Sequence, residues 1–295
     1  MYKYSLTVLT PTYDRAYTLT RVYESLVKQT KQDFQWIIID DGSSDGTEEL
    51  IMSFPKTGFE LEYHKKSNGG KHTALNYAHQ FIKGEMVVIV DSDDYLTDDA
   101  VETIQRDWLK YKNDKRIAGM SYMRILGGGT VYLSKRPPEN ECISDHIQYR
   151  DNGNITGDQC EVIRSALLKK YPFPVFENER FMSEGWLWRT IAKRYKTVYR
   201  AKCIYVCEYL EGGLTKSGRG LRMSCPQGML ENCRAFFVPG MDIKIQIKEM
   251  LLYDVYAICS DRSVFKEISK SRRIIGTTLL LPVGYLLYIY WRNNI

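Results

Sequence analysis

Short runs of apolar, mostly β-branched residues alternate with helical apolar periodicity along the first third of the chain. Strands are predicted near residues 6–9, 36–39, 61–64 and 86–90, with amphipathic helices between them. The first strand is expected to end before Pro11, and the third to lie at an edge. Residues 86–90 are apolar at every position, which is typical of a strand buried on both faces of a parallel sheet. The pattern predicts an α/β fold with a doubly wound, mostly parallel sheet that has helices on both faces.

Polar turns follow three of these strands, at residues 10–15, 40–46 and 91–95. Right-handed crossovers would place all three turns at the same edge of the sheet. Ligands of open α/β sheets bind at that edge, outside the carboxyl ends of the strands. Within the second turn, Asp45 and Glu48 have the spacing of a capping box that begins a helix.

The turn after the fourth strand carries three carboxylates within four positions. Asp91 and Asp93 alternate along an extended chain, so both side chains can turn toward one point. Their mutual repulsion would be relieved by a hard divalent cation bound through one or two carboxylates and substrate phosphates. The alternative is an acidic turn that caps the next helix, although residues 97–99 already offer oxygens for that purpose.

Composition narrows the class of protein further. A chain of 295 residues with 44% hydrophobic and 26% charged residues can form one large or two smaller domains. A net charge of +5 without arginine-rich blocks argues against a nucleic-acid partner. No secretory signal is visible before the first strand, which predicts a cytoplasmic protein. The seven cysteines lack zinc spacing and are expected to be free thiols.

The three turns together resemble those of glycosyltransferase family 2. The resemblance rests on Thr10-Pro11-Thr12-Tyr13-Asp14, on residues 40–47 (DDGSSDGT), on Asn68-Gly69-Gly70-Lys71 and on Asp91-Ser92-Asp93-Asp94, and it covers residues 4–220. It implies a GT-A fold and transfer of a sugar from a nucleotide donor, usually a UDP-sugar, with inversion at the anomeric carbon.

The extent of the resemblance and the composition of the tail predict a division of the chain. Residues 1–220 would form the GT-A domain, with a nucleotide-sugar-binding half at 1–110 and an acceptor-side half at 111–220. Residues 221–295 would form a C-terminal helical region that includes a membrane-associating tail at 274–291.

Five residues receive donor-side roles from the resemblance. Pro11 and Tyr13 would border the base, with the tyrosine ring packed on it, and Asp41 would accept a hydrogen bond from the uracil imide. Asp93 would bind Mg²⁺ or Mn²⁺ bridging the diphosphate. Asp91 would hold the ribose or the water shell of the metal.

Other polar residues keep two interpretations. Lys71 is placed to meet a phosphate or the sugar, or is an exposed surface lysine. Asp14 stands where the family commonly has asparagine. Asp158 is expected to precede a helix at residues 162–167, either as its N-cap or as a substrate contact.

Glu184 is the candidate catalytic residue. An apolar periodicity after it predicts a helix that begins at this position, where a carboxylate is stabilised by the helix dipole and could serve only that purpose. The family carries its catalytic acidic residue here, usually as a Glu-Asp pair. The second position is Gly185 in this chain, so Glu184 alone would act as the base.

Two later segments complete the chain. The segment from Glu208 to Gly218 is glycine-rich and cationic, and is expected to be either a mobile lid over the nucleotide or a plain surface loop. Residues 274–291 contain no charged residue and have basic flanks, although Pro282 and Gly284 interrupt them. A spanning helix needs about 20 apolar residues, so the segment fits an interfacial helix on anionic lipid, or else a helix packed on the protein.

Together with the tail, the resemblance implies a metal-dependent inverting glycosyltransferase that moves a sugar to a hydroxyl acceptor in bacterial surface polysaccharide synthesis. Its expected partners are a nucleotide-sugar donor, a glycan or lipid-linked glycan acceptor and a membrane surface at the inner face of the cell membrane. A nucleotidyltransferase is the first alternative, but the glycine- and arginine-rich phosphate loop expected of it is not seen near the N-terminus. The second is a non-catalytic glycan- or lipid-binding protein of the same fold, which would have no need for the clustered carboxylates.

Overall fold

The computed structural model describes residues 2–127, 129, 131–135, 137, 139–208, 214–260 and 262–294. The chain forms two compact units. We call them the sheet unit, Met1–Asp145, Ile155–Pro172 and Ile191–Leu210, and the helical unit, His146–Asn154, Phe173–Thr190 and Glu211–Ile295. The predicted domain division at residue 220 stays a prediction.

The sheet unit contains every strand that the structure describes, together with five helices. The strands are β1 (Tyr4–Thr12), β2 (Gln35–Asp40), β3 (Glu60–Lys65), β4 (Gly84–Ile89), β5 (Tyr95–Leu96), β6 (Ile117–Leu126), β7 (Glu141–Ser144), β8 (Gln159–Arg164) and β9 (Lys196–Cys207). The helices are α1 (Ala16–Val27), α2 (Thr47–Met52), α3 (Lys71–Ala78), α4 (Ala100–Tyr111) and α5 (Ser165–Lys170).

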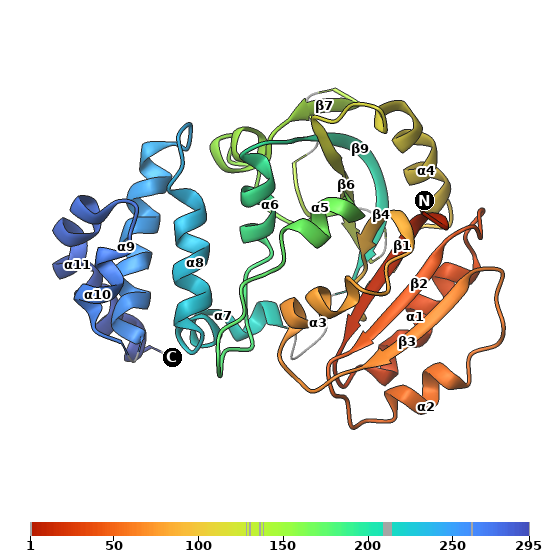
Figure 1. Cartoon of the computed structure of the whole chain (residues 1–295), viewed down its shortest axis with the longest axis horizontal. Coiled ribbons are helices and arrows are strands. Elements are labelled where there is room, and N and C mark those ends of the chain that lie inside the picture. Colours follow the sequence, from red (N-terminus) through yellow and green to blue (C-terminus); the bar gives the residue numbers. More distant parts are fainter. Residues whose placement is uncertain are drawn as a thin grey trace. The chain divides into compact units, whose positions relative to one another are not determined.

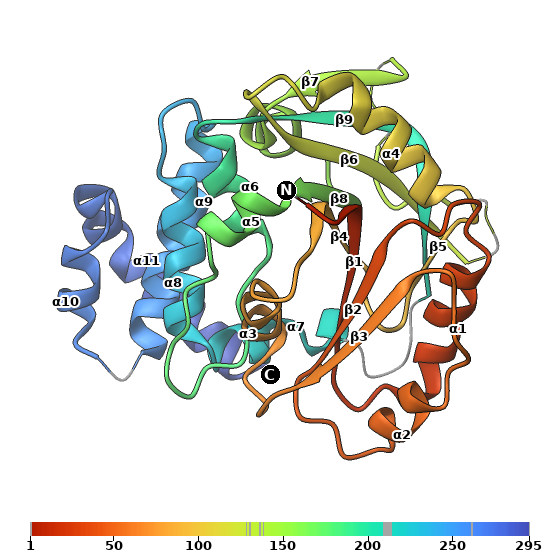
Figure 2. The same cartoon turned by 45° about the vertical axis from the view of Figure 1, so that its right-hand side comes forward.

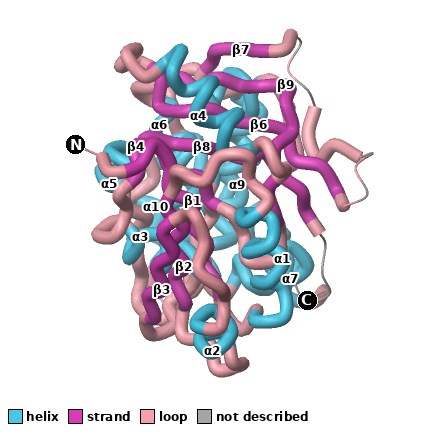
Figure 3. Tube along the Cα trace, turned by 90° about the vertical axis from the view of Figure 1, so that its right-hand side faces the viewer, coloured by secondary structure: helices cyan, strands magenta, loops and turns pink. Residues whose placement is uncertain are grey.

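The strands form one sheet in the order β3-β2-β1-β4-β8-β6-β9-β5, with β7 paired to β9. Strands β3, β2, β1 and β4 run parallel to one another, and β6 is parallel to β9, whereas β8 runs antiparallel to both β4 and β6. Figures 1 and 2 show β3, β2 and β1 side by side, and Figure 3 shows the strands in magenta. The prediction of a mostly parallel α/β sheet, with the third strand at its edge, is confirmed.

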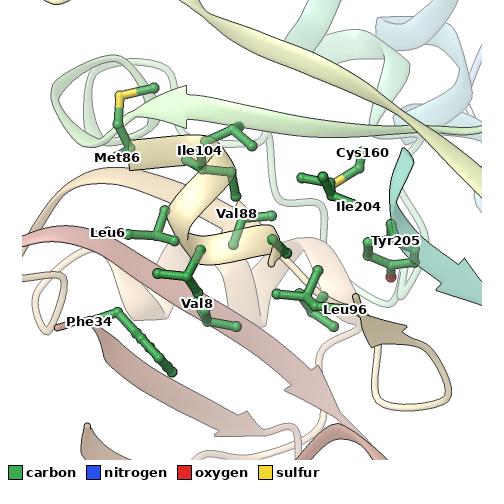
Figure 4. Close-up of a cluster of buried hydrophobic side chains, with 14 of the residues drawn as sticks. Leu6, Val8, Phe34, Met86, Val88, Leu96, Ile104, Cys160, Ile204 and Tyr205 are labelled. Atoms are coloured by element: carbon green, nitrogen blue, oxygen red, sulfur yellow. The ribbon is translucent and has the colours of Figure 1, made fainter. Parts of the chain in front are cut away.

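Both faces of β4 are buried, as its apolar run predicted, and so are those of β1 and β2, whereas the edge strand β3 is partly exposed. On one face, Leu6, Val8, Trp36 and Val88 belong to a core with side chains of α1, α2 and α4. Figure 4 shows several members of this core, which also takes in side chains from β8 and β9. On the other face Ile37, one position along β2, is also fully buried, and α3 packs against β1 and β2.

The parallel register brings the carboxyl ends of the strands together. Thr12 at the end of β1 pairs with Asp40 at the end of β2, and Asp40 pairs with Lys65 at the end of β3. The prediction that β1 ends before Pro11 is wrong. The strand pairs with β2 through Thr12, whereas its pairing with β4 ends at Leu9, and a proline is tolerated where one side of a strand is unpaired.

Two local predictions in the sheet unit are also wrong. Residues 162–164 belong to strand β8, and only Ser165–Lys170 are helical, because pairing with β4 and β6 overrides the apolar periodicity. The capping box does not form either: Gly46, with φ 82°, is the N-cap of α2. The Asp45 carboxylate instead accepts a hydrogen bond from the Ala16 backbone N–H at 2.9 Å.

The helical unit holds most of the C-terminal part of the chain, drawn in blue in Figure 1. It contains the π-helix η1 (Ile147–Asn152), the first six residues of α6 (Gly185–Ala192), and α7 (Leu214–Met223), α8 (Pro226–Phe236), α9 (Ile243–Cys259), α10 (Val264–Ser269) and α11 (Ile274–Arg292). Helix α11 is continuous through Pro282, so the predicted C-terminal helix is confirmed.

Buried acids connect the elements of this unit. The Glu179 carboxylate accepts hydrogen bonds from the backbone N–H groups of Gln227 and Gly228 at 2.7 Å each, at the start of α8. Glu267 in α10 is fully buried and lies 2.7 Å from Lys270 Nζ. In the segment predicted to be a lid or a loop, residues 209–213 lie outside the described residues. From Leu214 onward the segment belongs to α7, which is kinked at Gly218, where φ is 50°.

Candidate active site

The first two turns at the carboxyl edge of the sheet are tied to each other by side chains. Asp14, with φ 48° in the left-handed region, donates its backbone N–H to Ser43 Oγ at 2.9 Å. Its carboxylate accepts a hydrogen bond from the Ser44 backbone N–H at 2.7 Å. Asparagine also tolerates a positive φ and offers a side-chain oxygen, so the departure from the family pattern leaves this local geometry available. Asp14 therefore holds the turns together.

Asp41 organises the turn that precedes α3. Its carboxylate accepts hydrogen bonds from Lys66 Nζ at 2.6 Å and from the backbone N–H groups of Gly69 and Gly70 at 3.0 and 2.7 Å. Gly42 beside it has φ 89°, and a Cβ there would lie 2.9 Å from the Asn68 backbone nitrogen. Sequence reasoning missed Lys66. The predicted contact of Asp41 with a uracil imide stays a prediction.

Pro11 and Tyr13 lie beside these turns. Pro11 is buried at the end of β1, whereas the Tyr13 side chain is 47% exposed. A large aromatic ring that is left half exposed next to fixed turns offers a surface on which a flat ring can stack. Asp158, by contrast, is exposed and immediately precedes β8 rather than a helix, so the helix N-cap predicted for it is wrong.

The acidic turn is built on two cationic side chains from other elements. Lys71, the first residue of α3, forms an ion pair with the Asp91 carboxylate. Arg124 in β6 lies 3.9 Å from the Asp94 carboxylate and 4.1 Å from the centre of the Tyr205 ring. The Tyr205 hydroxyl in turn accepts a hydrogen bond from the Asp91 backbone N–H at 3.0 Å.

Arg124 and Tyr205 were not identified from the sequence. They lie in β6 and β9, thirty or more residues after the last aspartate of the acidic turn, and reach it only because the sheet brings these strands beside it. A partial signal was available: Arg124 interrupts an otherwise apolar run in the last part of β6. A charged residue in such a position needs a buried partner.

The three carboxyl groups of the turn differ in pKa. Burial alone would raise the pKa of Asp91, but the charges of Lys71 and Arg124 outweigh burial and hold it below its usual value. Burial and the neighbouring Asp91 raise the pKa of Asp93, and the same two causes raise the pKa of Asp94 to about 6. The turn therefore carries more negative charge than its own lysine and arginine neutralise.

Asp93 is the residue of this turn that fits a metal ion. Its carboxylate makes no hydrogen bond or ion pair with another residue in the part of the chain that the structure describes. Among those described residues there is no preformed group of three or more His, Cys, Asp or Glu side chains suited to a metal. One carboxylate with raised pKa beside a second one matches Mg²⁺ or Mn²⁺ that takes its remaining ligands from water and phosphates.

Glu184 belongs to the helical unit, whereas the other predicted site residues belong to the sheet unit. It is half buried and immediately precedes α6, and its carbonyl accepts a hydrogen bond from the Leu187 N–H at 2.9 Å, which confirms the predicted place at a helix start. A Cβ at Gly185 would lie 2.5 Å from Arg189 Nη1, and that guanidinium is paired with Asp151 at 2.8 Å. In this unit, Arg189 occupies the space next to residue 185 where a second acidic side chain would begin.

The fold is a mostly parallel α/β sheet, and polar turns meet at the carboxyl ends of its strands. Proteins of this class bind their ligands at that edge. Residues 7–170 match the sequence profile described as glycosyl transferase family 2. This chain belongs to that family, and the resemblance stated from its motifs is confirmed.

Two bacterial glycosyltransferases are similar in sequence to this chain. Glycosyltransferase GlyA of Streptococcus pneumoniae serotype 4 is 26% identical over 227 residues, which are 72% of this chain and 31% of GlyA. The Escherichia coli protein WfgD, named as a UDP-Glc:α-D-GlcNAc-diphosphoundecaprenol β-1,3-glucosyltransferase, is 24% identical over 69% of this chain and 76% of its own length. The chain thus spans about a third of the length of GlyA.

Solved structures share the fold. Staphylococcus aureus TarS in complex with UDP-GlcNAc superposes with a TM-score of 0.63 at 16% identity, over 98% of this chain and 92% of that one. A mannosyltransferase of Pyrobaculum calidifontis, PcManGT, in complex with GDP-Man and Mn²⁺ gives a TM-score of 0.56 at 17% identity, over 99% and 84% of the two chains. These similarities establish the GT-A fold.

Proposed function

We propose that this chain is an inverting, metal-dependent glycosyltransferase that moves a sugar from a UDP-sugar to a hydroxyl acceptor. The observation that carries the proposal is the acidic turn at the sheet edge. There Asp93 has a raised pKa and no ion-pair partner among the described residues, while the carboxylates on either side of it lie beside Lys71 and Arg124. A perturbed carboxylate of this kind is typical of a functional site, and a divalent cation bound together with the substrate would neutralise it.

The donor would bind along the two interlocked turns. Tyr13 would stack on the base, with Pro11 beneath it and Asp41 accepting a hydrogen bond from the imide. Because Asp41 already fixes the Gly69–Gly70 turn through two backbone N–H groups, the same carboxylate would couple base recognition to the start of α3. Lys71, the first residue of that helix, would meet a phosphate or the sugar.

Asp93 would hold Mg²⁺ or Mn²⁺, with Asp91 on the ribose or on the water shell of the metal. When bound, the cation supplies Lewis-acid stabilisation of the negative charge on the departing nucleoside diphosphate. The support from this chain is the chemistry of the donor set, namely two neighbouring carboxylates at a sheet edge. The support from a protein of the same fold is PcManGT, whose complex contains Mn²⁺.

Glu184 would act as the general base. It would take the proton of the acceptor hydroxyl while the oxygen of that hydroxyl attacks the anomeric carbon on the face opposite the leaving diphosphate. The bond from the anomeric carbon to the diphosphate oxygen breaks as the new glycosidic bond forms, which inverts the configuration in a single displacement. With Gly185 after it, no second carboxylate shares this role on the same turn.

The acceptor would be a growing or lipid-linked bacterial surface glycan. WfgD is similar to 69% of this chain and is named for a diphosphoundecaprenol-linked acceptor. A lipid-linked acceptor would place the reaction at the inner face of the cell membrane, where nucleotide-sugars are available.

A donor panel tests the proposal. The protein is incubated with UDP-Glc, UDP-GlcNAc and GDP-Man, with Mn²⁺ or with a chelator, and both thermal stability and nucleoside diphosphate release are followed. We expect one UDP-sugar to raise the melting temperature and to be hydrolysed slowly, in each case only with the metal. Stabilisation by nucleoside triphosphates with pyrophosphate release would instead identify a nucleotidyltransferase. Binding of glycans without any response to nucleotide-sugars would identify a non-catalytic protein.

A further inference from the structure

Helix α11 exposes large apolar side chains along one of its faces. Its buried residues are small, Thr277 and Gly284, whereas several of its large apolar residues are exposed. Five of these exposed residues form a stripe, which we call the α11 stripe. They are Ile275, Leu279, Val283, Leu286 and Tyr290, each between 51% and 76% exposed.

The spacing of the stripe follows the helix. At 3.6 residues per turn its five members fall within an arc of about 80°, and Thr277 and Gly284 lie roughly on the opposite side. A helix that contributes to a soluble core buries its large residues and exposes small or polar ones. Helix α11 half buries Leu280, Leu281 and Leu287 but exposes large apolar residues along one face, so packing within the chain does not account for that exposed face.

The side of α11 that carries Gly276 and Gly284 packs against α9 in the same unit. A Cβ at Gly276 would lie 2.3 Å from Met250 Sδ, and a Cβ at Gly284 would lie 2.7 Å from Asp254 Cβ. Near the end of the helix, the Trp291 ring centre lies 6.5 Å from that of Tyr256. These close contacts fix α11 against α9 and aim the stripe away from it.

The surroundings of the stripe are basic. Residues 262–292 contain a single acidic residue, Glu267, and it is fully buried. The exposed charged residues of this segment are all positive: Arg262, Lys266, Lys270, Arg272, Arg273 and Arg292. Arg272 and Arg273 precede the helix and Arg292 ends it, so positive charge lies at both ends of the apolar stripe.

We propose that the α11 stripe binds the surface of an anionic lipid bilayer, with the helix lying in the plane of the interface. An apolar stripe with cations at both ends matches acyl chains bordered by anionic headgroups, and tyrosine and tryptophan side chains favour the same depth. A second copy of this chain would present the same positive charges and would be repelled. The inference does not depend on the proposed sugar transfer.

The docked arrangement also decides between lying on the bilayer and crossing it. Among the described residues, α11 is the one helix long and apolar enough to cross a membrane, with 11% of its central window buried. Its partner α9 carries Lys244, Lys248, Glu249 and Asp254, and charges of this kind are costly inside a bilayer. While α11 stays docked on α9, the pair can therefore bind at the interface but not span.

Vesicle binding by the full chain tests the proposal. Flotation is measured with phosphatidylcholine vesicles and with mixed phosphatidylcholine–phosphatidylglycerol vesicles, at low and high salt. We expect binding to the anionic vesicles only, weakened by salt, and release by alkaline carbonate, which does not extract a spanning helix. Equal binding to both vesicle types, resistance to carbonate or no binding at all would each overturn the assignment.

Matched variants locate the surface. Leu279→Ser combined with Leu286→Ser should weaken binding by roughly 10–100-fold, because two large aliphatic side chains no longer enter the lipid. The control is Ile243→Ser combined with Ile247→Ser, which removes two exposed aliphatic residues of α9 in the same unit and should leave binding unchanged. Equal loss in both variants would contradict the stripe.

A charge variant keeps the test independent of folding of the serine variants. Arg272→Gln combined with Arg292→Gln should weaken binding to anionic vesicles by about fivefold per residue at low salt and have little effect at high salt. Unchanged binding by this variant would overturn the electrostatic part. A concentration-dependent dimer that the Leu279→Ser, Leu286→Ser variant abolishes, without vesicle binding, would show that a second copy covers the stripe instead.

Discussion

At the edge of the sheet, buried carboxylates lie beside cations: Lys71 pairs with Asp91, and Arg124 lies 3.9 Å from Asp94. In the helical unit, Asp254 is fully buried under Gly284 of α11, and both of its carboxylate oxygens lack a hydrogen-bond partner. The same unit exposes the apolar α11 stripe. Within the part of the chain that the structure describes, every carboxylate of the acidic turn except Asp93 thus lies beside a cation in the first region. In the second region, the buried Asp254 has no described cation beside it, and the α11 stripe is exposed.

This difference separates two kinds of incompleteness. The acidic turn has more negative charge than its own residues neutralise, so a cation and a diphosphate complete it. The α9–α11 pair has an exposed apolar surface that no described element of the chain covers, so we expect a lipid bilayer to cover it. A small polar ligand would stabilise the first region and a bilayer the second, and variants of each region should affect one property without the other.

The largest effect is expected from Asp93→Asn, which removes the candidate metal ligand. Transfer should be nearly abolished, falling on the order of 10⁴-fold or more, because the loss of a bound cation costs several kcal/mol of transition-state stabilisation. Initial rates with a UDP-sugar and Mn²⁺ measure it, beside Asp98→Asn as a control on an exposed carboxylate of the same region. Activity that persists in this variant and in excess chelator would contradict the metal assignment.

Glu184→Gln tests the proposed base. The value of kcat should fall by ~10²–10⁴, with donor affinity nearly unchanged, because the amide cannot accept the acceptor proton. Rates and calorimetric UDP binding are compared with those of Glu177→Gln, an exposed glutamate of the same unit. If UDP affinity falls more than turnover does, Glu184 is a folding or donor-site residue.

Asp254→Asn tests the unpaired buried acid. Burial raises the pKa of Asp254 to about 7, so the folded state binds a proton that the unfolded state releases near pH 4. Stability is therefore full below the unfolded pKa and is lost as pH rises through the folded pKa, by roughly 2–4 kcal/mol in total.

Hydrogen exchange of the α9 and α11 backbone amides, corrected for intrinsic rates, measures this loss between pH 5 and 8. Protection should decrease with pH in the natural chain and stay level in Asp254→Asn, while Glu177→Gln keeps the natural profile. A pH dependence that is the same in all three proteins would show that Asp254 does not titrate in this range.

Arg124→Met probes the cation beneath the acidic turn. We expect a loss of about 3 kcal/mol in the free energy of unfolding, the low end for breaking a buried pair, because Asp94 still accepts a hydrogen bond from the Glu208 N–H. Thermal and urea unfolding are compared with those of Arg116→Met, whose partner Asp114 lies at the surface and whose loss should cost under about 1 kcal/mol. Equal costs would show that burial of Arg124 carries no special weight.

Asp41→Ala should have the smallest effect of the five. UDP binding should weaken by about 1.5–3 kcal/mol, the usual worth of a hydrogen bond to a charged group. Calorimetry measures the change, with Asp33→Ala as an exposed control. Unchanged UDP affinity would leave Asp41 with only its observed role of holding the Gly69–Gly70 turn.

Much of the site was readable because its parts are local. Strand runs ending in polar turns predicted which loops would meet, and the motifs predicted the family. The helix start after Glu184 was readable too, from apolar periodicity alone. The sequence did not predict the basic partners of Asp41 and Asp94, because Lys66 and Arg124 reach these carboxylates from elements distant in sequence.

The sequence by itself determined the parallel α/β architecture, since strand and helix periodicities are local consequences of which residues are apolar. It also determined the acidic turns, because a strand that ends in carboxylates must present them at its carboxyl end. Only the tertiary structure decided that residues 162–164 are a strand, because pairing with β4 and β6 outweighs local preference. Only it decided that α11 packs its glycines against α9 and turns the α11 stripe outward, because that choice depends on the shape of α9.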